Sequence, residues 1–542
     1  MTISTGRTVI VGGVAAGMST ATRLRRNDEF REIVVLERGD HVSFANCGLP
    51  YHLGGVIADR DDLLLQTPAG LHDRFRLDVR VRHEVRRIDR DRRTVAVLDL
   101  CTDLTTEIAY DELVLATGAA PVRPSIPGIE RALVLRDLAD MDTIGSRLHG
   151  AATAVILGGG FIGLELAENL TRRGVTVTVV ELADRILAPL DPEMAAPVAR
   201  HLQQHGVRIR TGTSATAIEP GVVTLTDGSR LPADVVIAAI GVRPESGLAR
   251  DAGLDIGATG GVVVDGHQRT SDPRIFAVGD VAEKIDQLGG GATLVPLANT
   301  ANRHGRLVAD VICGRAVAAR PTLGTAVVGL FGLTAAVTGS NENRLRAAGR
   351  PYRAIHTHPA NHAGYYPGAQ PMALKLLLDP TTGAILGAQG VGGDGVDKRI
   401  DVIATALRGG LTGPDLADLE LAYAPQFGAA KDPVTMLGMI ADNLAAGECT
   451  VQWHELDTVL ARGAVLVDVR SAAEFAAGTI AGAINIPLEQ LRTRAAQIPP
   501  GPVVVTCAVG QRGHAAARLL RQLGRDVANL DGGYRTWSAA AA

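Results

Sequence analysis

The sequence predicts an α/β protein of several domains, and three observations carry that prediction. Its 542 residues exceed the length of one ordinary domain. A pattern of strand, glycine turn, helix and strand occurs twice, beginning near residues 8 and 154. From about residue 453, strands and helices alternate again on a smaller scale. We therefore expect two Rossmann-like domains, an α+β domain and a small C-terminal α/β domain.

The first unit begins with the apolar strand 8–11 and passes through a glycine turn into a helix that runs to Arg26. It returns in strand 33–36, and Val14 holds the position of the middle glycine of the G-x-G-x-x-G pattern. The residues at the ends of two later strands, near residues 117 and 279, are expected to contact the same nucleotide. The expected contacts are Gly12, Gly13, Ala16, Gly17, Glu37, Arg38, Thr117, Gly118, Gly279 and Asp280.

The second unit has all three fingerprint glycines, Gly158, Gly160 and Gly163, between strands 154–157 and 176–180. Glu181 ends the second strand, where a carboxylate accepts from a ribose 2′-hydroxyl and repels a 2′-phosphate. Glu181 therefore favours binding of NADH, and NADPH remains an alternative. Gly241, after strand 235–240, is a further expected contact. Two such units predict two dinucleotides, FAD and NAD(H).

The order of these patterns predicts domain limits, because strand 274–280 returns the chain to the first domain after the second has been completed. We expect the following parts: 1–115 with 245–321 for FAD, 116–244 for NAD(H), 322–443 for the α+β domain, 444–452 for a linker, and 453–542 for the last domain.

Cys47 lies in the segment Ser43–Tyr51, and no second cysteine follows within a turn or two. A cycle through an internal disulfide needs two neighbouring thiols, so Cys47 is expected to exchange with a sulfur or oxygen from outside the chain. A helix beginning after Asn46 would lower the pKa of the thiol. The alternative is a buried structural cysteine.

Cys507 and Arg512 form a C-x4-R loop between strand 503–506 and a helix. The loop amides and the guanidinium could bind a persulfide or a small oxyanion, and a phosphatase loop would have one residue more. Asp468 and Arg470 are expected to form a structural ion pair. The remaining cysteines are expected to be packing or surface residues: Cys101, Cys313 and Cys449. Three histidines have no neighbouring acid at ligand spacing and are expected not to bind metal: His356, His358 and His362.

Composition excludes several classes of partner. The formal net charge is −4 and the isoelectric point is about 6.4, so there is no basic field for nucleic acid or anionic membranes. The N-terminal residues show no signal-peptide pattern, and five scattered cysteines do not form a disulfide framework. We expect a cytoplasmic protein without nucleic-acid or membrane partners.

These motifs resemble the flavin-dependent pyridine nucleotide-disulfide oxidoreductases, and within them the coenzyme A-disulfide reductase and NADH-dependent persulfide reductase branch fused to a rhodanese domain. The segment Ser43–Tyr51 is similar to that branch's single-cysteine motif, and His52 stands where relatives with C-x4-C have a second cysteine. The resemblance to rhodanese rests on four segments: 468–470, 482–487, the Cys507 loop and 531–534.

The resemblance implies a homodimer in which the α+β domain is the dimerisation domain and tyrosines of one subunit assist Cys47 of the other. The matching residues are Tyr365 and Tyr423, with Tyr366 a rival of Tyr365. It also implies that coenzyme A, as substrate or bound thiol, contacts Arg26, Ser43, Asn46 and Arg303; Phe75 stands where some relatives have a basic residue.

The expected activity is reduction of coenzyme A persulfide, polysulfide or coenzyme A disulfide by NADH through FAD and Cys47, with the Cys507 domain handling sulfane sulfur. Two alternatives stay open at this point. One is an NADH oxidase or peroxidase that uses a Cys47 sulfenic acid. The other is a flavin-bound redox sensor or sulfur-delivery protein.

Overall fold

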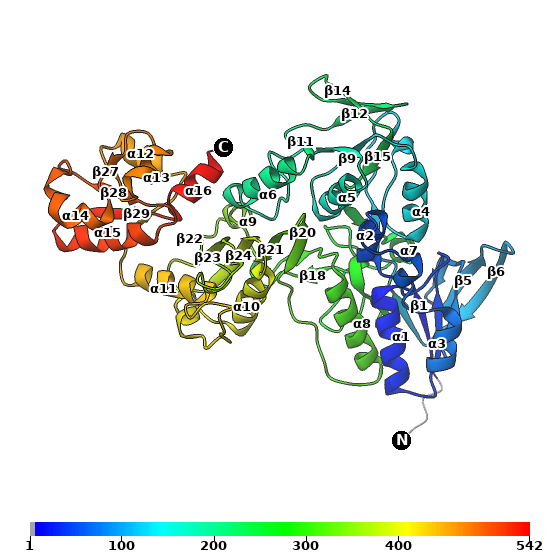
Figure 1. The fold of residues 1–542 in the computed structure, drawn as a ribbon. Helices are drawn as coiled ribbons and strands as arrows, with labels where there is room; N and C mark the ends of the chain where they lie inside the picture. Colours follow the sequence, from blue (N-terminus) through cyan, green and yellow to red (C-terminus); the bar gives the residue numbers. More distant parts are fainter. Residues whose placement is uncertain (1–5, 542) are drawn as a thin grey trace. The chain divides into compact units, whose positions relative to one another are not determined.

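The computed structural model describes residues 6–541 (Figure 1). The first five residues and Ala542, which belong to the first and last expected domains, lie outside the described residues. The chain forms two compact units: one comprises the chain up to Leu182 together with Arg210–Thr322, and the other comprises Ala183–Ile209 and the chain from Leu323 onward. Among the described residues, each helix is too short or too polar to cross a bilayer.

A five-stranded parallel sheet in the order β17-β7-β1-β2-β3 lies at the centre of the first unit. Its strands are β1 (Arg7–Val11), β2 (Glu32–Leu36), β3 (Asp78–Arg80), β7 (Glu112–Leu115) and β17 (Ile275–Ala277). Both faces of such a sheet are covered, so its strands are apolar at successive positions. Val9 and Val11 pack into one core, and Ile10 packs into another with α1 (Ala15–Asn27) and α8 (Ala298–Ile312).

A second sheet of this unit has the order β11-β10-β9-β15. Its strands are β9 (Thr153–Leu157), β10 (Thr176–Val180), β11 (Arg208–Arg210) and β15 (Val235–Ala238), and α5 (Phe161–Arg172) connects β9 to β10. β9 pairs in parallel with both β10 and β15. The two strand–helix–strand units predicted from the glycine patterns are confirmed.

Smaller elements complete the first unit. The helices are α2 (Leu49–Leu53), α3 (Pro68–Phe75), α4 (Leu138–Arg147) and α7 (Gly247–Asp251). Two antiparallel sheets contain β4 (His83–Asp89), β5 (Thr94–Asp99) and β6 (Leu104–Ala109), and β12 (Ala215–Glu219), β13 (Val222–Leu225) and β14 (Arg230–Pro232). Two strand pairs are β8 (Ala119–Pro121) with β16 (Val242–Pro244), and β18 (Lys284–Ile285) with β19 (Ala292–Thr293). The β8–β16 pair lies where the chain passes between the two nucleotide-binding sheets.

The second unit contains an antiparallel sheet in the order β20-β21-β24-β23-β22. Its strands are β20 (Ala326–Leu330), β21 (Leu333–Gly339), β22 (Arg353–Thr357), β23 (Met372–Leu378) and β24 (Ile385–Gly392). The accompanying helices are α6 (Pro192–Gln204), α9 (Glu342–Ala347), α10 (Val396–Gly409) and α11 (Pro433–Ala445). Although α6 falls in the range expected for the NAD(H) domain, it belongs to this unit.

The last part of the chain is a parallel sheet in the order β25-β29-β28-β26-β27, surrounded by short helices (Figure 1). The strands are β25 (Thr450–Val451), β26 (Val465–Asp468), β27 (Ile484–Asn485), β28 (Val503–Thr506) and β29 (Val527–Leu530). The helices are α12 (Leu456–Ala461), α13 (Ala472–Ala476), α14 (Leu488–Arg494), α15 (Gln511–Gln522) and α16 (Gly533–Ala540). The predicted α+β and α/β parts are therefore both present.

The connection predicted at 444–452 is shorter than expected. α11 continues through Ala445 and β25 begins at Thr450, so only residues 446–449 lie outside helices and strands. Even these are bound to the last domain: the Cys449 carbonyl accepts from Asn529 N at 3.0 Å, and Glu448 pairs with His514 at 2.7 Å. Hydrogen bonds therefore restrain this segment along most of its length.

Candidate active site

Cys47 lies in the 3-10 turn Asn46–Gly48, directly before α2. α2 packs closely against α5: at Gly54, just after α2, an added Cβ would collide with the Asn169 side chain of α5. Arg173 also donates to the Leu53 carbonyl at 3.1 Å. The helix that directly follows the exposed cysteine is therefore held against the helix of the second glycine fingerprint.

A tyrosine and a glutamate lie beside this cysteine, and the sequence analysis did not identify them. The Tyr51 hydroxyl donates to Glu165 Oε1 at 3.1 Å, and burial of that carboxyl raises its pKa. Tyr51 follows Cys47 by one helical turn and ends the cysteine segment, and Glu165 lies two residues beyond the last fingerprint glycine, Gly163. Only the packing of α2 on α5 brings them together.

The prediction of a lowered thiol pKa is wrong for the chain by itself. Burial raises the pKa of Cys47, and the carboxylates of Glu165 and Asp280 raise it further. α2 has only five residues, so few peptide dipoles are aligned toward the sulfur. Burial and the two carboxylates thus both disfavour the thiolate.

The first fingerprint turn has the geometry that a dinucleotide requires. Gly12 has φ +105°, and a Cβ there would collide with the Ala116 carbonyl. Glu37 Oε2 accepts from Gly13 N at 2.7 Å, which holds the carboxylate at the end of β2. A Cβ at Gly17 would collide with the Gly12 carbonyl, so α1 packs closely on this turn.

The second turn repeats these contacts. Gly158 has φ +107° and lies against the Ala239 carbonyl, while Glu181 Oε2 accepts from Gly159 N at 2.7 Å. No atom lies within 4 Å of the position that a Cβ would take at Gly160, so a phosphate has room to approach the backbone. The residues present at both turns fit a bound dinucleotide.

The other predicted cofactor contacts lie around the same sheet edges. Glu245 links two of these regions, since its carboxylate accepts from Arg38 at 2.8 Å and its carbonyl accepts from the Thr117 hydroxyl at 2.9 Å. Gly118, Gly241 and Gly279 all have positive φ. Burial raises the pKa of Asp280, which follows Gly279.

A buried lysine supports this last turn and was not predicted. Lys284 Nζ donates to the carbonyls of Gly279 and Ala282 at 2.5 and 3.0 Å. Burial lowers the pKa of Lys284 to about 8. The ammonium therefore helps to fix the backbone that presents Asp280.

The predicted coenzyme A contacts lie on the first unit around Cys47 and α1. Ser43 adopts φ +48° and its N–H donates to the Gly13 carbonyl at 2.9 Å, which ties the cysteine segment to the first fingerprint turn. Arg26 is exposed and its guanidinium carbon lies 5.9 Å from the Phe75 ring centre, as does that of Arg74. Asn46 and Arg303 are also exposed.

Two of the three candidate tyrosines form a pair on the second unit. The hydroxyl oxygens of Tyr365 and Tyr423 lie 3.0 Å apart, and the residues are 77% and 49% exposed. Tyr366 instead packs edge-on against the His362 ring, 5.6 Å away. The pairing favours Tyr365 over Tyr366 as the partner of Tyr423.

Cys507 directly follows β28 and is fully buried. Arg512, expected to face an anion at this cysteine, makes two hydrogen bonds to Glu474, at 2.6 and 2.8 Å. These bonds hold the pKa of Glu474 at about 2. The guanidinium is thus held by a glutamate of α13 that the sequence analysis missed, although Ser471 and Glu474 form a recognisable capping box.

Other expectations for the last domain and the remaining cysteines are confirmed. Arg470 and Asp468 form a buried ion pair, with Nη2 and Oδ2 2.6 Å apart. Cys101 and Cys449 are exposed, and Cys313 is partly buried.

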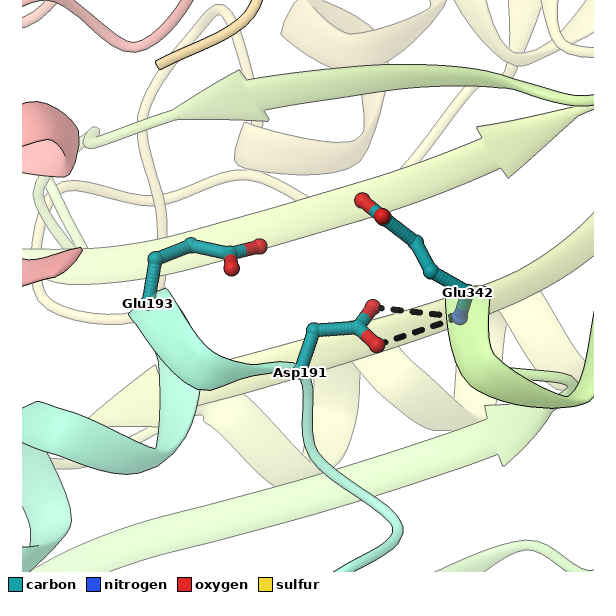
Figure 2. A group of neighbouring side chains, drawn as sticks. All are labelled: Asp191, Glu193 and Glu342. Atoms are coloured by element: carbon teal, nitrogen blue, oxygen red, sulfur yellow. Dashed lines mark hydrogen bonds between the residues drawn. The ribbon is translucent and has the colours of Figure 1, made fainter. Parts of the chain in front are cut away.

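Three buried carboxylates meet in the second unit, as Figure 2 shows for Asp191, Glu193 and Glu342. Their spacing would suit a metal ion, but Lys375 Nζ contacts all three groups, at 2.9 Å from Asp191, 2.6 Å from Glu342 and also close to Glu193. We therefore assign the centre of the cluster to the Lys375 ammonium.

His356 has acidic neighbours that its sequence surroundings do not reveal. Its ring nitrogens lie 2.6 Å from Asp531 and 3.0 Å from Glu193. Both acids are more than a hundred residues away along the chain, so no local spacing could indicate them.

Comparison with known proteins agrees with this architecture. The family model of the pyridine nucleotide-disulphide oxidoreductases matches residues 6–305, the model of their dimerisation domain matches 325–433, and the rhodanese-like domain model matches 452–540.

Individual relatives resemble most of the chain. The crystal structure of reduced CoADR-RHD from Bacillus anthracis is 46% identical, with a TM-score of 0.98 over 99% of this chain and 98% of that one. The NAD-dependent persulfide reductase from A. fulgidus is 38% identical, with a TM-score of 0.92 over 98% and 100%. Coenzyme A disulfide reductase of Staphylococcus epidermidis is 33% identical over 433 residues, which cover 79% of this chain and 98% of the relative.

These matches confirm the resemblance drawn from the motifs. The two turns that fit dinucleotides, the cysteine beside them and the separate C-terminal sheet all fall within the matched ranges. The chain therefore belongs to the pyridine nucleotide-disulphide oxidoreductases, as an FAD-dependent enzyme that binds NAD(H) and carries both their dimerisation domain and a C-terminal rhodanese-like domain.

Proposed function

We propose that this enzyme uses NADH to reduce coenzyme A persulfide through Cys47, and that its rhodanese-like domain handles the sulfane sulfur. The observation that carries the proposal is the presence in one chain of an exposed Cys47, directly before the helix that packs on the second fingerprint helix, and of Cys507 in a rhodanese-like domain. A sulfur-carrying domain has a use only if the substrate contains sulfane sulfur.

The two glycine turns divide the binding of cofactors. The first turn, with Glu37, binds FAD, and the second, with Glu181, binds NADH through its ribose hydroxyls. FAD held at the first turn would supply two-electron transfer between NADH and the Cys47 sulfur. Ser43 keeps the cysteine segment in place beside the first turn, and Asn46 ties it to the Arg136 carbonyl.

At Cys47, the thiolate attacks the inner sulfur of coenzyme A persulfide. A disulfide forms between Cys47 and coenzyme A, the sulfur–sulfur bond of the persulfide breaks, and HS⁻ leaves with the electron pair of that bond. Two electrons and one proton then release coenzyme A as its thiol and restore the Cys47 thiolate. The sum is NADH plus coenzyme A persulfide giving NAD⁺, coenzyme A and HS⁻.

A second copy of the chain supplies the tyrosines in this proposal. Tyr365 and Tyr423 are exposed and paired on the unit that contains the dimerisation domain, so their hydroxyls are available to another subunit. The pair would donate a hydrogen bond to the departing coenzyme A thiolate.

Cys507 prepares the substrate. Its thiolate takes the outer sulfur of thiosulfate, with release of sulfite, and becomes a persulfide. Transfer of that sulfur to the coenzyme A thiol gives coenzyme A persulfide and restores the Cys507 thiolate. The loop amides and Arg512 would stabilise the persulfide anion.

An anaerobic acceptor screen tests the proposal. NADH oxidation is followed with coenzyme A persulfide, coenzyme A disulfide and polysulfide, and separately with oxygen and peroxide, for the wild type, Cys47→Ser and Cys507→Ser. We expect the highest kcat/KM with coenzyme A persulfide, its loss in Cys47→Ser, and its retention in Cys507→Ser. Faster turnover with oxygen or peroxide would establish the oxidase or peroxidase alternative, and no turnover with any acceptor would support a sensor.

A further inference from the structure

The turn Asp531–Tyr534 shapes the loop that contains Cys507. A Cβ at Gly533 would collide with the Cys507 carbonyl, and Gly533 has φ +62°. Tyr534 N donates to the Cys507 carbonyl at 2.8 Å, and Arg535 N donates to the Ala508 carbonyl at 3.0 Å. The first amides of α16 therefore fix the backbone on which the Cys507 loop is built.

The same turn is held from its other side by a residue of the dimerisation domain. His356 on β22 donates from its backbone N to Asp531 Oδ2 at 3.0 Å, and its ring Nδ1 lies 2.6 Å from the same oxygen. A Cβ at Gly532 would lie 2.8 Å from His356 Cβ. Gly533 therefore packs on the Cys507 loop, and the preceding residue, Gly532, packs on His356.

A buried charge network stands behind His356. Its Nε2 lies 3.0 Å from Glu193 Oε1, and Lys375 contacts Glu193 together with the other two carboxylates of Figure 2. Lys375 is 0% exposed, His356 4% and Asp531 5%. Because both ring nitrogens face carboxylates, His356 can satisfy both only as an imidazolium with two N–H donors.

Neighbouring contacts restrain the same position. His358 Nε2 lies 2.7 Å from the Thr536 hydroxyl on α16, and α16 packs against α6, the helix that carries Glu193. In such a buried network, loss of one partner leaves another charge without compensation, so the remaining groups must move.

We propose that His356, supported by Glu193 and Lys375, is a positioning residue for sulfur transfer at Cys507: it holds Asp531 and, through Gly532–Tyr534, the shape of the Cys507 loop. This inference rests on the proposed sulfur-transfer role of Cys507. It makes the sulfurtransferase loop depend on a side chain that lies outside the rhodanese-like domain.

Two substitutions at His356 separate its two contacts. In His356→Asn, the amide nitrogen stands near the position of Nδ1 and can still donate to Asp531. In His356→Gln, it reaches the position of Nε2, near Glu193, so the side-chain contact with Asp531 is lost and only the backbone N–H of residue 356 still donates to Asp531. His201→Gln is the matched control, since it makes the same change on α6 away from Asp531.

Sulfur transfer from thiosulfate to cyanide in the holoenzyme is the first readout. We expect kcat/KM to fall about 10- to 100-fold in His356→Gln, as for other misplaced catalytic groups, and much less in His356→Asn. Reduction of ferricyanide by NADH should stay near the wild-type value, as in His201→Gln, while the melting temperature of His356→Gln should fall because a buried charge is lost from the network. Equal activity in His356→Gln and wild type would overturn the inference, as would equal losses in the two His356 variants.

A second readout does not depend on sulfur transfer. Alkylation of Cys507 by iodoacetamide, followed by peptide mass spectrometry across pH, should change its rate and midpoint in His356→Gln but not in His201→Gln. An unchanged profile would contradict the positioning role. If the wild type showed this alkylation but no sulfur transfer, the proposed function of the domain would fail while the positioning role stood.

The final test is whether the effects of substitutions at His356 and Asp531 on sulfur transfer are coupled. It also applies if His356→Gln is poorly stable. Asp531→Ala should reduce sulfur transfer to the same extent, and the double variant should be no worse than either single variant. Additive losses would show that the two residues act separately and would overturn the inference.

Discussion

The Tyr51 hydroxyl donates a hydrogen bond across 3.1 Å to the carboxylate of Glu165, which joins the helix after Cys47 to the helix after Gly160. One hydrogen bond therefore connects the helix that follows the redox cysteine expected beside FAD with the first helix of the expected NAD(H) domain. The same carboxylate raises the pKa of Cys47.

Glu165→Gln should lower the pKa of the Cys47 thiol, because the substitution removes one of the two negative charges that disfavour the thiolate. The measurement is the rate of Cys47 alkylation against pH, whose midpoint should move to lower pH. Glu168→Gln on the same helix is the control, and its midpoint should match the wild type. A midpoint that stays in place in Glu165→Gln would show that Glu165 does not act on the thiol.

Tyr365→Phe should reduce kcat for coenzyme A persulfide by about 10- to 100-fold, within the range of a lost general acid. Tyr366→Phe should have a small effect, since only the Tyr365 hydroxyl lies beside that of Tyr423. Steady-state kinetics of both variants decide between them. The reverse order of effects would assign the role to Tyr366.

Glu181→Ala should narrow the preference for NADH over NADPH, because the carboxylate that would repel a 2′-phosphate is gone. The ratio of kcat/KM for the two nicotinamides measures this. FAD content should be unchanged, since Glu181 lies at the second turn. A wild-type enzyme that prefers NADPH would refute the assignment.

Arg512→Ala should lower sulfur transfer from thiosulfate to about the level of Cys507→Ser, while reduction of preformed coenzyme A persulfide persists. Glu474→Gln should have an intermediate effect, because Glu474 holds the guanidinium through two hydrogen bonds. Arg518→Ala, an exposed arginine of the same helix, is the control. Loss of persulfide reduction in Arg512→Ala would place this loop in the reductive cycle.

The stability of the protein should fall as the pH rises from about 6.5 to 9, in part through His356. Burial disfavours the imidazolium, but Asp531 and Glu193 more than offset it and raise the pKa of His356 to about 9. A group whose pKa is raised on folding contributes its full stabilisation when the pH is below its pKa in the unfolded chain. This stabilisation, about 3 kcal/mol for His356, is lost as the pH rises through its pKa in the folded protein.

Unfolding of wild type and His356→Asn at pH 6.5 and 9 measures this contribution. The difference in stability between the two proteins should be larger at pH 6.5 than at pH 9. His358 acts in the opposite sense, since burial lowers its pKa to about 3 and its contribution is lost on acidification. A difference that is the same at both pH values would exclude a charged His356.

Local patterns in the sequence were sufficient for the fold class, the two nucleotide turns and both candidate cysteines. Each depends on residues that are close along the chain: an apolar strand, a glycine that accepts positive φ, and a carboxylate at the next strand end. Backbone sterics and the burial of parallel strands act at that range, so the sequence by itself determines them.

Tertiary packing alone decided the chemical surroundings of these residues. The sequence suggested a lowered pKa for Cys47, but burial raises that pKa, and the packing of α2 on α5 brings Glu165 close, which raises it further. Likewise, Glu474 meets Arg512, and His356 meets Asp531, only when elements far apart in the chain pack together. Burial and Coulomb interactions depend on distance in space, and spacing along the sequence does not report that distance.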